Sequence, residues 1–109
     1  MELSEIKEKL DTLGIPVAYL CFKKPQTLPY CVYNEAATDI QGADNYNLYR
    51  DVTINIELYC EKKQPQLERQ LENLFRDREI TKTPDIYLKD EDMYMTTFSF
   101  ETIQYIEED

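Results

Sequence analysis

The sequence predicts an α+β fold, a two-layer sandwich in which a mainly antiparallel sheet carries two helices on one face. Three observations lead to this prediction. The chain has 109 residues, a common length for one domain, so residues 1–109 are expected to form a single unit. Helical and strand patterns follow one another in the order α-β-β-β-α-β-β. Neighbouring strand patterns are joined by short turns, which is typical of antiparallel sheets with helices on one side.

The first element is a helix over residues 3–13. Its apolar residues recur at spacings of three and four and form one stripe, made by Leu3, Ile6, Leu10 and Leu13. Gly14 and Pro16 follow directly and are expected to end the helix. Two strands are predicted next: an apolar one over 17–22, and one over 30–34 that is rich in aromatic and β-branched residues.

Residues 35–49 show neither a helical nor a strand period, and we predict a long loop there. Loops of about fifteen residues are uncommon inside compact domains and often carry function. The strand over 52–60 is the clearest in the chain, because apolar residues at even positions alternate with more polar ones at odd positions. One of its faces is therefore predicted to lie in the core and the other to remain polar.

The second helix is predicted over residues 65–78. Pro65 suits its first turn, where the missing N–H would have no intrahelical partner. The helix has an apolar stripe formed by Leu67, Leu71, Leu74 and Phe75. A short strand over 86–88 and an acidic turn over 90–92 complete the central part of the chain.

Residues 93–105 are predicted to form a long last strand. Phe98 and Phe100 share one face of it, whereas Ile103 and Tyr105 have the opposite parity. If all four side chains are to face the core, the strand must change parity between them. We therefore expect a β-bulge or a twist near residues 101–102.

The composition predicts an intracellular protein with no membrane partner. The cysteines Cys21, Cys31 and Cys60 are an odd set within apolar segments, which favours buried free thiols over a disulfide framework. No apolar run approaches the roughly 18–20 residues that would span a bilayer. The first residues lack the basic start and apolar run of a signal peptide.

The charge argues against nucleic-acid binding. The chain has 12 basic and 22 acidic residues and a formal net charge of −10, whereas phosphate contacts need clustered lysine and arginine. The excess is concentrated in residues 85–109, which hold eight acids against one base, while residues 61–79 hold five of each. We expect the C-terminal part to form an acidic surface that repels DNA and RNA.

The residue types do not favour catalysis, and we predict that the protein is not an enzyme and needs no cofactor. There is no histidine, so no Ser-His or Cys-His arrangement is available. The two glycines, Gly14 and Gly42, stand too far apart for a phosphate-binding loop. Ser4, one of two serines, is better explained by its place at the start of the first helix.

A calcium site at the acidic turn is also disfavoured. Asp90 and Asp92, with Glu101, have the spacing of the ends of a calcium-binding loop. Tyr94 replaces a ligand, however, and Met95 stands where a glycine must make the turn. A solvated hairpin turn is the favoured interpretation, and no metal ligands are assigned.

Tyrosines supply the candidate interaction site. The chain has nine tyrosines and no tryptophan, and tyrosine is enriched at protein interfaces because it offers apolar area together with a hydroxyl. The candidate interface residues lie in or beside the predicted loop and on the polar side of the clearest strand: Asp44, Tyr46, Tyr49 and Tyr59. The alternative is that the tyrosines line the core and its rim.

Three stretches give the chain a resemblance to a known family. They are Leu-Gly-Ile-Pro-Val-Ala-Tyr at 13–19, Ile-Glu-Leu-Tyr-Cys-Glu-Lys-Lys at 56–63, and Tyr-Leu-Lys-Asp-Glu-Asp-Met-Tyr at 87–94. In these stretches the chain resembles the small tail-completion proteins (tail terminator or head–tail joining proteins) of tailed phages and prophages of Gram-positive bacteria. The resemblance extends over nearly the whole chain. These stretches are structural patterns without a catalytic fingerprint, and Cys60 stands where the family often has threonine or another polar residue.

The resemblance implies a structural protein of the virion. Such proteins assemble as a ring, typically of six subunits, that stops growth of the tail tube and presents a surface to the head connector. The implied partners are other copies of the chain, the tail tube protein and the head connector protein, and the implied location is the host cytoplasm during assembly and then the virion. An acidic ring would not retain the DNA that passes through it. The alternative function is an acidic phage-encoded inhibitor that mimics DNA and binds a host protein.

Overall fold

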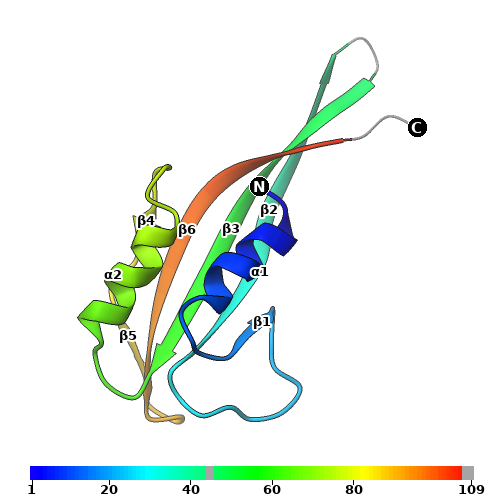
Figure 1. Ribbon diagram of the computed structural model, residues 1–109. Helices are drawn as coiled ribbons and strands as arrows, with labels where there is room; N and C mark the ends of the chain where they lie inside the picture. Colours follow the sequence, from blue (N-terminus) through cyan, green and yellow to red (C-terminus); the bar gives the residue numbers. More distant parts are fainter. Residues whose placement is uncertain (44–45, 107–109) are drawn as a thin grey trace.

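The computed structural model describes residues 1–43 and 46–106, and of residues 43 and 46–48 it describes the backbone alone. Two helices lie on one face of a six-stranded sheet (Figure 1), which confirms the predicted α+β sandwich. The predicted order of elements is also confirmed, with a two-residue strand added. The elements are α1 (Leu3–Asp11), β1 (Val17–Tyr19), β2 (Tyr30–Ala43), β3 (Tyr46–Cys60), α2 (Pro65–Leu74), β4 (Thr81–Lys82), β5 (Ile86–Leu88) and β6 (Met93–Tyr105).

The sheet is centred on β3. The strand order is β1-β2-β3-β6-β4, and β5 also pairs with β6. The β1–β2 pair is parallel and the other pairs are antiparallel. Because β3 has β2 on one side and β6 on the other for most of its length, its own alternation decides which side chains of the sheet face the helices.

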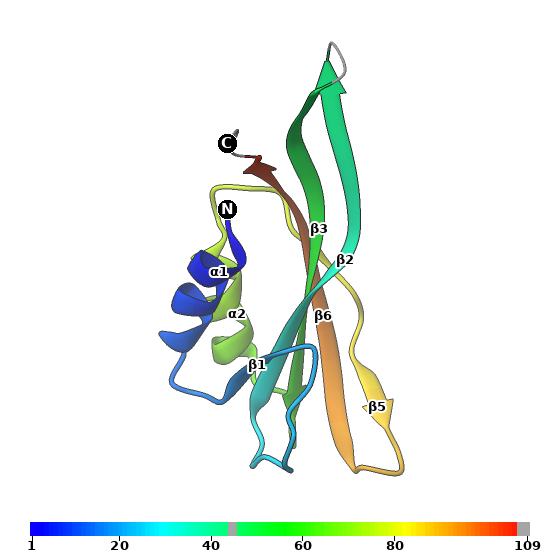
Figure 2. The same ribbon diagram turned by 90° about the vertical axis from the view of Figure 1, so that its right-hand side faces the viewer.

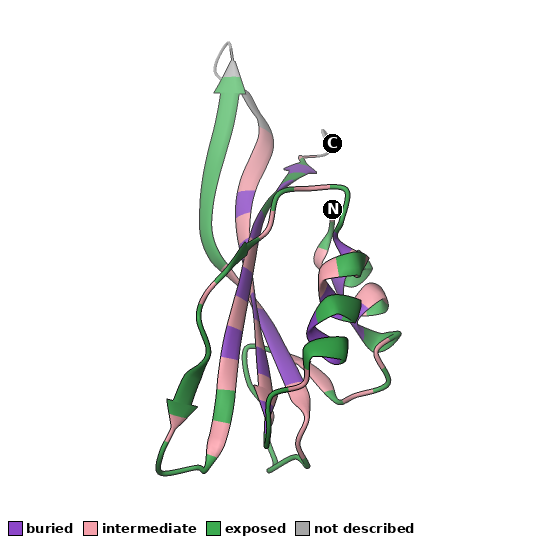
Figure 3. Ribbon diagram, turned by 90° about the vertical axis from the view of Figure 1, so that its left-hand side faces the viewer, coloured by how far each residue is buried: buried purple, intermediate pink, exposed green. Residues whose placement is uncertain are grey.

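The core lies between the helices and the inner face of the sheet, which is the face that α1 and α2 cover. The even-numbered residues of β3 from Val52 to Leu58 are at most 1% exposed, as the alternation in the sequence predicted. The helices and β6 add further fully buried side chains, namely Ile6, Leu10, Leu71, Phe75 and Phe98. Figure 3 shows these buried positions along the strands and on the sheet-facing sides of the helices. Each such side chain contributes about 1.5–3 kcal/mol through burial.

Both helices end earlier than predicted. Helix α1 ends at Asp11, and Gly14 adopts a φ of 74° in the turn that follows. Helix α2 ends at Leu74 because Phe75 leaves the helical conformation, with a φ of −122°, and enters the core. There its ring stacks on that of Phe100 at a centroid distance of 4.6 Å.

The prediction of a loop over residues 35–49 is wrong, because most of this segment extends β2 and β3 into a long antiparallel hairpin. Cα pairing runs from Tyr30 opposite Tyr59 to Ala43 opposite Tyr46, with register shifts between Glu35 and Ala37 and between Gln41 and Gly42. Residues 36–42 of β2 are all exposed, so neither of their faces requires apolar residues. The period-2 pattern is missing for that reason, and backbone pairing alone shapes the strand.

The hairpin makes the molecule elongated. Its extents are 51 × 29 × 24 Å and its radius of gyration is 15.5 Å, compared with about 13 Å for a compact domain of this length. Residues 36–43 of β2 and 46–51 of β3, which we call the arm, extend beyond both helices (Figure 2). The arm therefore contributes little to the core.

The predicted bulge in β6 is also wrong. The strand pairs with β3 without a register shift from Tyr49 opposite Tyr105 to Cys60 opposite Tyr94. Thr102 and Gln104 take the inner positions and are each 4% exposed. Both have polar partners at residue Met1, whose nitrogen donates to Thr102 Oγ1 at 2.8 Å and whose carbonyl accepts from Gln104 Nε2 at 3.2 Å. The apolar side chain of Ile103 is left on the opposite, open side.

The expectation of three buried thiols holds for two of them. Cys31 and Cys60 are buried, and burial raises the pKa of Cys31 to about 12 and that of Cys60 to about 11. Cys21 is exposed because β1 ends at Tyr19, two positions before it. The chain turns at Leu20, which has a φ of 67°.

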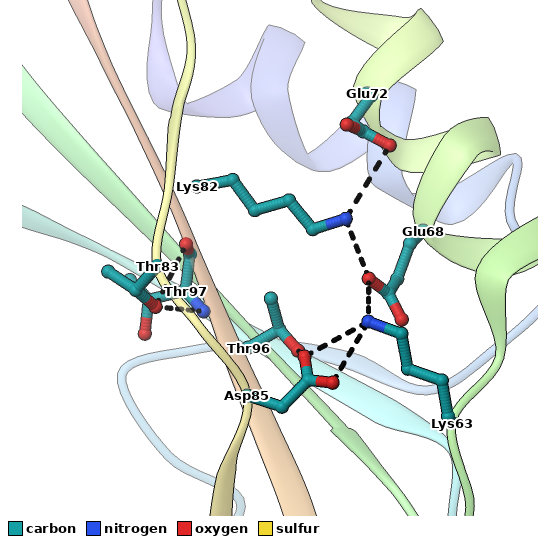
Figure 4. A network of polar contacts seen from close by, with 8 residues as sticks. All are labelled: Lys63, Glu68, Glu72, Lys82, Thr83, Asp85, Thr96 and Thr97. Carbon is teal, nitrogen blue, oxygen red and sulfur yellow. Dashed lines mark hydrogen bonds and ion pairs between the residues drawn. The ribbon is translucent and has the colours of Figure 1, made fainter.

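A buried carboxylate links α2 to the edge of the sheet. Glu68 is 3% exposed and forms ion pairs with Lys63 at 2.9 Å and Lys82 at 2.7 Å (Figure 4). Lys63 also pairs with Asp85 at 2.9 Å, and Thr96 donates a hydrogen bond of 2.6 Å to Asp85. The network thus connects α2, β4, the segment before β5, and β6. The two lysine side chains are 50% and 35% exposed, so solvent screens part of their attraction to Glu68.

The hydrogen bond from Thr96 gives the network a measurable pH dependence. This bond is the largest cause that lowers the pKa of Asp85 below its ordinary value, and the contact with Lys63 is the second. A lowered pKa stabilises the fold above the unfolded-state pKa, and the stabilisation is lost as pH falls through the folded-state value. Thr96→Val is expected to lower the free energy of unfolding by about 1–2 kcal/mol at pH 7. The difference from wild type should shrink below about pH 4, as urea denaturation would measure.

Thr97→Val is the matched control. Thr97 is the neighbouring residue on β6 and faces the opposite side of the sheet, and its side chain has no hydrogen bond to another described residue. A cost for Thr96→Val that is equal at pH 7 and at pH 3, or equal to that of Thr97→Val, would contradict the role assigned to Asp85.

Candidate assembly surface

The face of the sheet opposite the helices, which we call the outer face, is open over most of its length (Figure 2). Odd-numbered residues of β3 and β6 occupy it, since the two strands pair odd with odd. Its centre is polar, as predicted from the alternation in β3. Ser99 donates a hydrogen bond of 2.6 Å to Asn55 there. A polar centre leaves the apolar groups of this face at its two ends.

The structure separates the predicted interface residues. Tyr49 and Tyr59 both lie on the outer face of β3, but ten residues of strand place them about 33 Å apart. Tyr46 is the first residue of β3 and pairs with Ala43. Asp44 lies outside the described residues. The three of these residues that the structure describes, Tyr46, Tyr49 and Tyr59, therefore belong to two regions, the arm and the end of the sheet farthest from it.

Tyr59 lies at a groove at the end of the outer face far from the arm. Its ring stacks on that of Tyr30 at 5.0 Å, and Phe22 contacts the Tyr30 ring edge-on at 5.3 Å. The groove has a volume of about 510 Å³ and lies between the segment 20–26 and the turn that joins β5 to β6. Its apolar lining includes Leu20, Phe22, Tyr30, Val32, Tyr59, Leu88 and Met93.

The two walls of the groove differ in charge. Lys23 and Lys24 line one wall, and Glu91 lines the other. Burial, with a smaller contribution from the carboxylate of Glu57, raises the pKa of Tyr59 to about 12, so this phenol remains neutral at physiological pH. The groove can therefore hold an apolar side chain and offer two cations to a neighbouring anion.

The arm presents a second kind of surface, an open strand edge. Strand β1 pairs with β2 only from Cys31 to Tyr33. Beyond Tyr33, within the described part of the chain, β2 has β3 alone as a neighbour. Such an edge can hydrogen-bond to a strand of another chain. Ile40, which is 57% exposed, lies on this edge strand.

The acidic turn does not come together with Glu101. Asp92 directly precedes β6, whereas Glu101 lies nine residues further along the same strand, about 30 Å away. Asp92 instead accepts a hydrogen bond of 2.6 Å from the hydroxyl of Tyr87. Within residues 1–43 and 46–106, no group of three or more cysteine, aspartate or glutamate side chains is placed to hold a metal ion.

Comparison with known proteins leaves the chain without an assigned family. No protein-family model matches the sequence, and no curated protein matches it. Among the described helices, neither is long and apolar enough to cross a membrane.

Sequence reasoning selected Tyr59 as a candidate interface residue but did not predict the groove in which it lies. The groove combines Lys23, Lys24 and Tyr30 with Met93, which is more than sixty residues away in the chain. The two adjacent lysines directly follow the strand predicted over residues 17–22. Their proximity to Tyr59 depends on the register between β2 and β3, in which Tyr30 lies opposite Tyr59.

The packing of Tyr59 can be tested by titration. A raised pKa means that the fold is stabilised below the ordinary tyrosine value of about 10 and loses this stabilisation as pH rises through about 12. Tyr59→Phe is expected to remove one phenol that ionises near pH 12, as followed by phenolate absorbance. Glu57→Gln is expected to lower the pKa of the Tyr59 phenol, because the carboxylate of Glu57 contributes to raising it. If Tyr59→Phe removes a phenol that ionises at an ordinary pH, Tyr59 is solvated and the packing of the groove is contradicted.

Proposed function

We propose that the protein is a phage structural protein that caps the tail tube as a ring and joins the tail to the head. The observation that carries the proposal is the arm, a long paired hairpin that contributes little to the core of its own subunit. A long paired hairpin with an open strand edge that contributes little to the core is well suited to contact another subunit. The proposed partners are further copies of the chain, the tail tube protein and the head connector protein.

The position of the three family-like stretches also supports the proposal. Residues 13–19 contain β1, residues 56–63 contain the end of β3, and residues 87–94 contain β5 and the start of β6. Pairing places all three at the end of the sheet that carries the groove, since Val17 pairs with Cys31, Cys31 with Leu58, and Cys60 with Tyr94. Stretches far apart in the sequence thus lie together at one end of the sheet.

The acidic charge of the chain fits a ring through which DNA passes without being bound. The chain has 22 acidic and 12 basic residues, and the outer face carries carboxylates, including those of Asp51 and Glu57. A ring with such surfaces would let DNA pass without binding it. The alternative function, an inhibitor that mimics DNA, is supported by the same acidic excess.

The experiment that tests the proposal is removal of the gene from a phage or prophage that carries it, followed by electron microscopy of the particles. We expect tails of abnormal length, or heads and tails that remain separate, and expression of the intact protein should restore joined particles. Normal, infectious particles without the protein would overturn the proposal. If the purified protein instead competes with DNA for a host nuclease or repressor, the inhibitor function takes its place.

Shortening the arm should separate assembly from folding. Asp39 and Asp51 are paired across the hairpin, so an Asn-Gly turn can replace residues 40–50 without breaking the remaining register. The variant is expected to melt within a few degrees of the wild type, because the core lies elsewhere. In a phage-producing host it is expected to fail to complete tails.

Two outcomes would count against the role of the arm. If the shortened protein unfolds, the arm is needed for folding. If it folds and still supports infectious particles, the contacts between subunits lie outside the arm. Replacing residues 40–50 by glycine and serine at unchanged length is the matched control, because it retains the number of residues but removes the side chains and the strand propensity of the arm.

A further inference from the structure

The groove has a chemistry that selects among possible occupants. Its floor is apolar, formed by Tyr30, Val32, Tyr59 and Met93. Among the described residues, neither Lys23 nor Lys24 forms an ion pair. Two adjacent unpaired lysines beside an apolar floor suit a segment in which apolar side chains are followed directly by carboxylates.

This chain contains such a segment at the opposite end of the sheet. At the end of β6, Ile103 and Tyr105 are 38% and 78% exposed. Ile106 follows, and the sequence continues with three acids, Glu107-Glu108-Asp109. Exposed large apolar side chains next to acids are typical of a segment that binds another protein surface.

The segment and the groove of one copy cannot meet. Met93, at the start of β6, lines the groove, and Tyr105 ends the same strand, so about 40 Å of strand separates them. Fully extended, residues 106–109 span at most about 14 Å. An occupant with this sequence must therefore come from a second copy of the chain.

We propose that the groove binds residues 105–109 of a second copy of this chain. Tyr105 and Ile106 lie on the apolar floor, and the acids that follow lie along Lys23 and Lys24. The carboxylate of Glu91 on the opposite wall repels those acids and so fixes the direction of the segment. The proposal deepens the proposed function, on whose self-assembly it rests, by naming the surfaces that join neighbouring subunits.

The contact is heterologous, because it joins one end of a subunit to the other end of the next. Repetition of such a contact produces a ring if the rotation between subunits closes, and an open filament if it does not. Each subunit would use its groove once and its acidic segment once. Association should weaken as salt rises, because part of the attraction lies between exposed charges.

Sedimentation velocity on charge-reversed variants tests the proposal. Lys23→Glu with Lys24→Glu, and separately Glu107→Lys with Glu108→Lys, should each raise the concentration needed for self-association by about tenfold or more. The variant with all four changes should associate at about the wild-type concentration, because opposite charges again face each other. Failure of the fourfold variant to recover, or no effect of either pair, would overturn the proposal.

Two controls exclude general effects of charge. Lys62→Glu with Arg69→Glu changes the net charge by the same amount at two exposed residues outside the groove, and association should then change less than twofold. Glu91→Gln removes the repulsive wall and should lower the required concentration. Weakening by the Lys62 and Arg69 variant as strong as that by the Lys23 and Lys24 variant would also overturn the proposal.

Peptide titration covers the case of a chain that remains monomeric alone. A peptide of residues 103–109, added to isotope-labelled protein, should shift the amide signals of Tyr30, Val32, Tyr59 and Met93. Absence of these shifts up to millimolar peptide, together with absence of self-association, would overturn the proposal. If tails are completed normally by the Lys23 and Lys24 variant, the inference about the groove fails and the proposed function stands. If peptide binds but particles form normally without the protein, the proposed function fails instead.

Discussion

The alternation of side chains along β3 is the constraint on which the rest of the structure depends. The strand pairs with β2 on one side and β6 on the other, so its register fixes the inner and outer faces of both neighbours. Val52, Ile54, Ile56 and Leu58 are each at most 1% exposed. A slip of one residue would bring Glu57 and Asn55 into the core, at a cost comparable to the roughly 5–15 kcal/mol by which domains are stable. The helices, the outer face and the groove all follow from this one register.

Burial on one face of β3 also explains which parts of the fold could be predicted from the sequence alone. The part of β3 over 52–60 was predictable because its two faces meet different surroundings, and the apolar residues report that difference. The β2 half of the arm was not, because residues 36–42 are all exposed and the residue pattern then carries no period. In the arm, β2 is held by its pairing with β3, and β3 continues beyond the helices. The fold class was thus predictable where burial is one-sided, and the extent of the hairpin was not.

Contacts between residues far apart in the sequence explain the other differences between the prediction and the structure. Thr102 and Gln104 occupy buried positions because Met1, a hundred residues earlier, supplies hydrogen-bond partners. Because that contact cannot be inferred from the sequence, the parity of Ile103 and Tyr105 predicted a β-bulge or a twist near residues 101–102. In the candidate site, Tyr59 could be selected by its residue type and polar-side position. Its neighbours Lys23 and Met93 could not, because tertiary pairing alone brings them to one groove.

The elongated sheet also limits how copies of the chain can meet. The groove lies at one end of β6 and the exposed Tyr105 at the other, and an extended strand of this length keeps its two ends apart. Any attraction between these ends therefore acts between molecules and would arrange them head to tail. The large acidic excess opposes the close approach of subunits, so association has to depend on places where that excess is locally reversed. The wall formed by Lys23 and Lys24 is such a place. Contact at that wall would favour one end-to-end arrangement over the many in which acidic surfaces face each other.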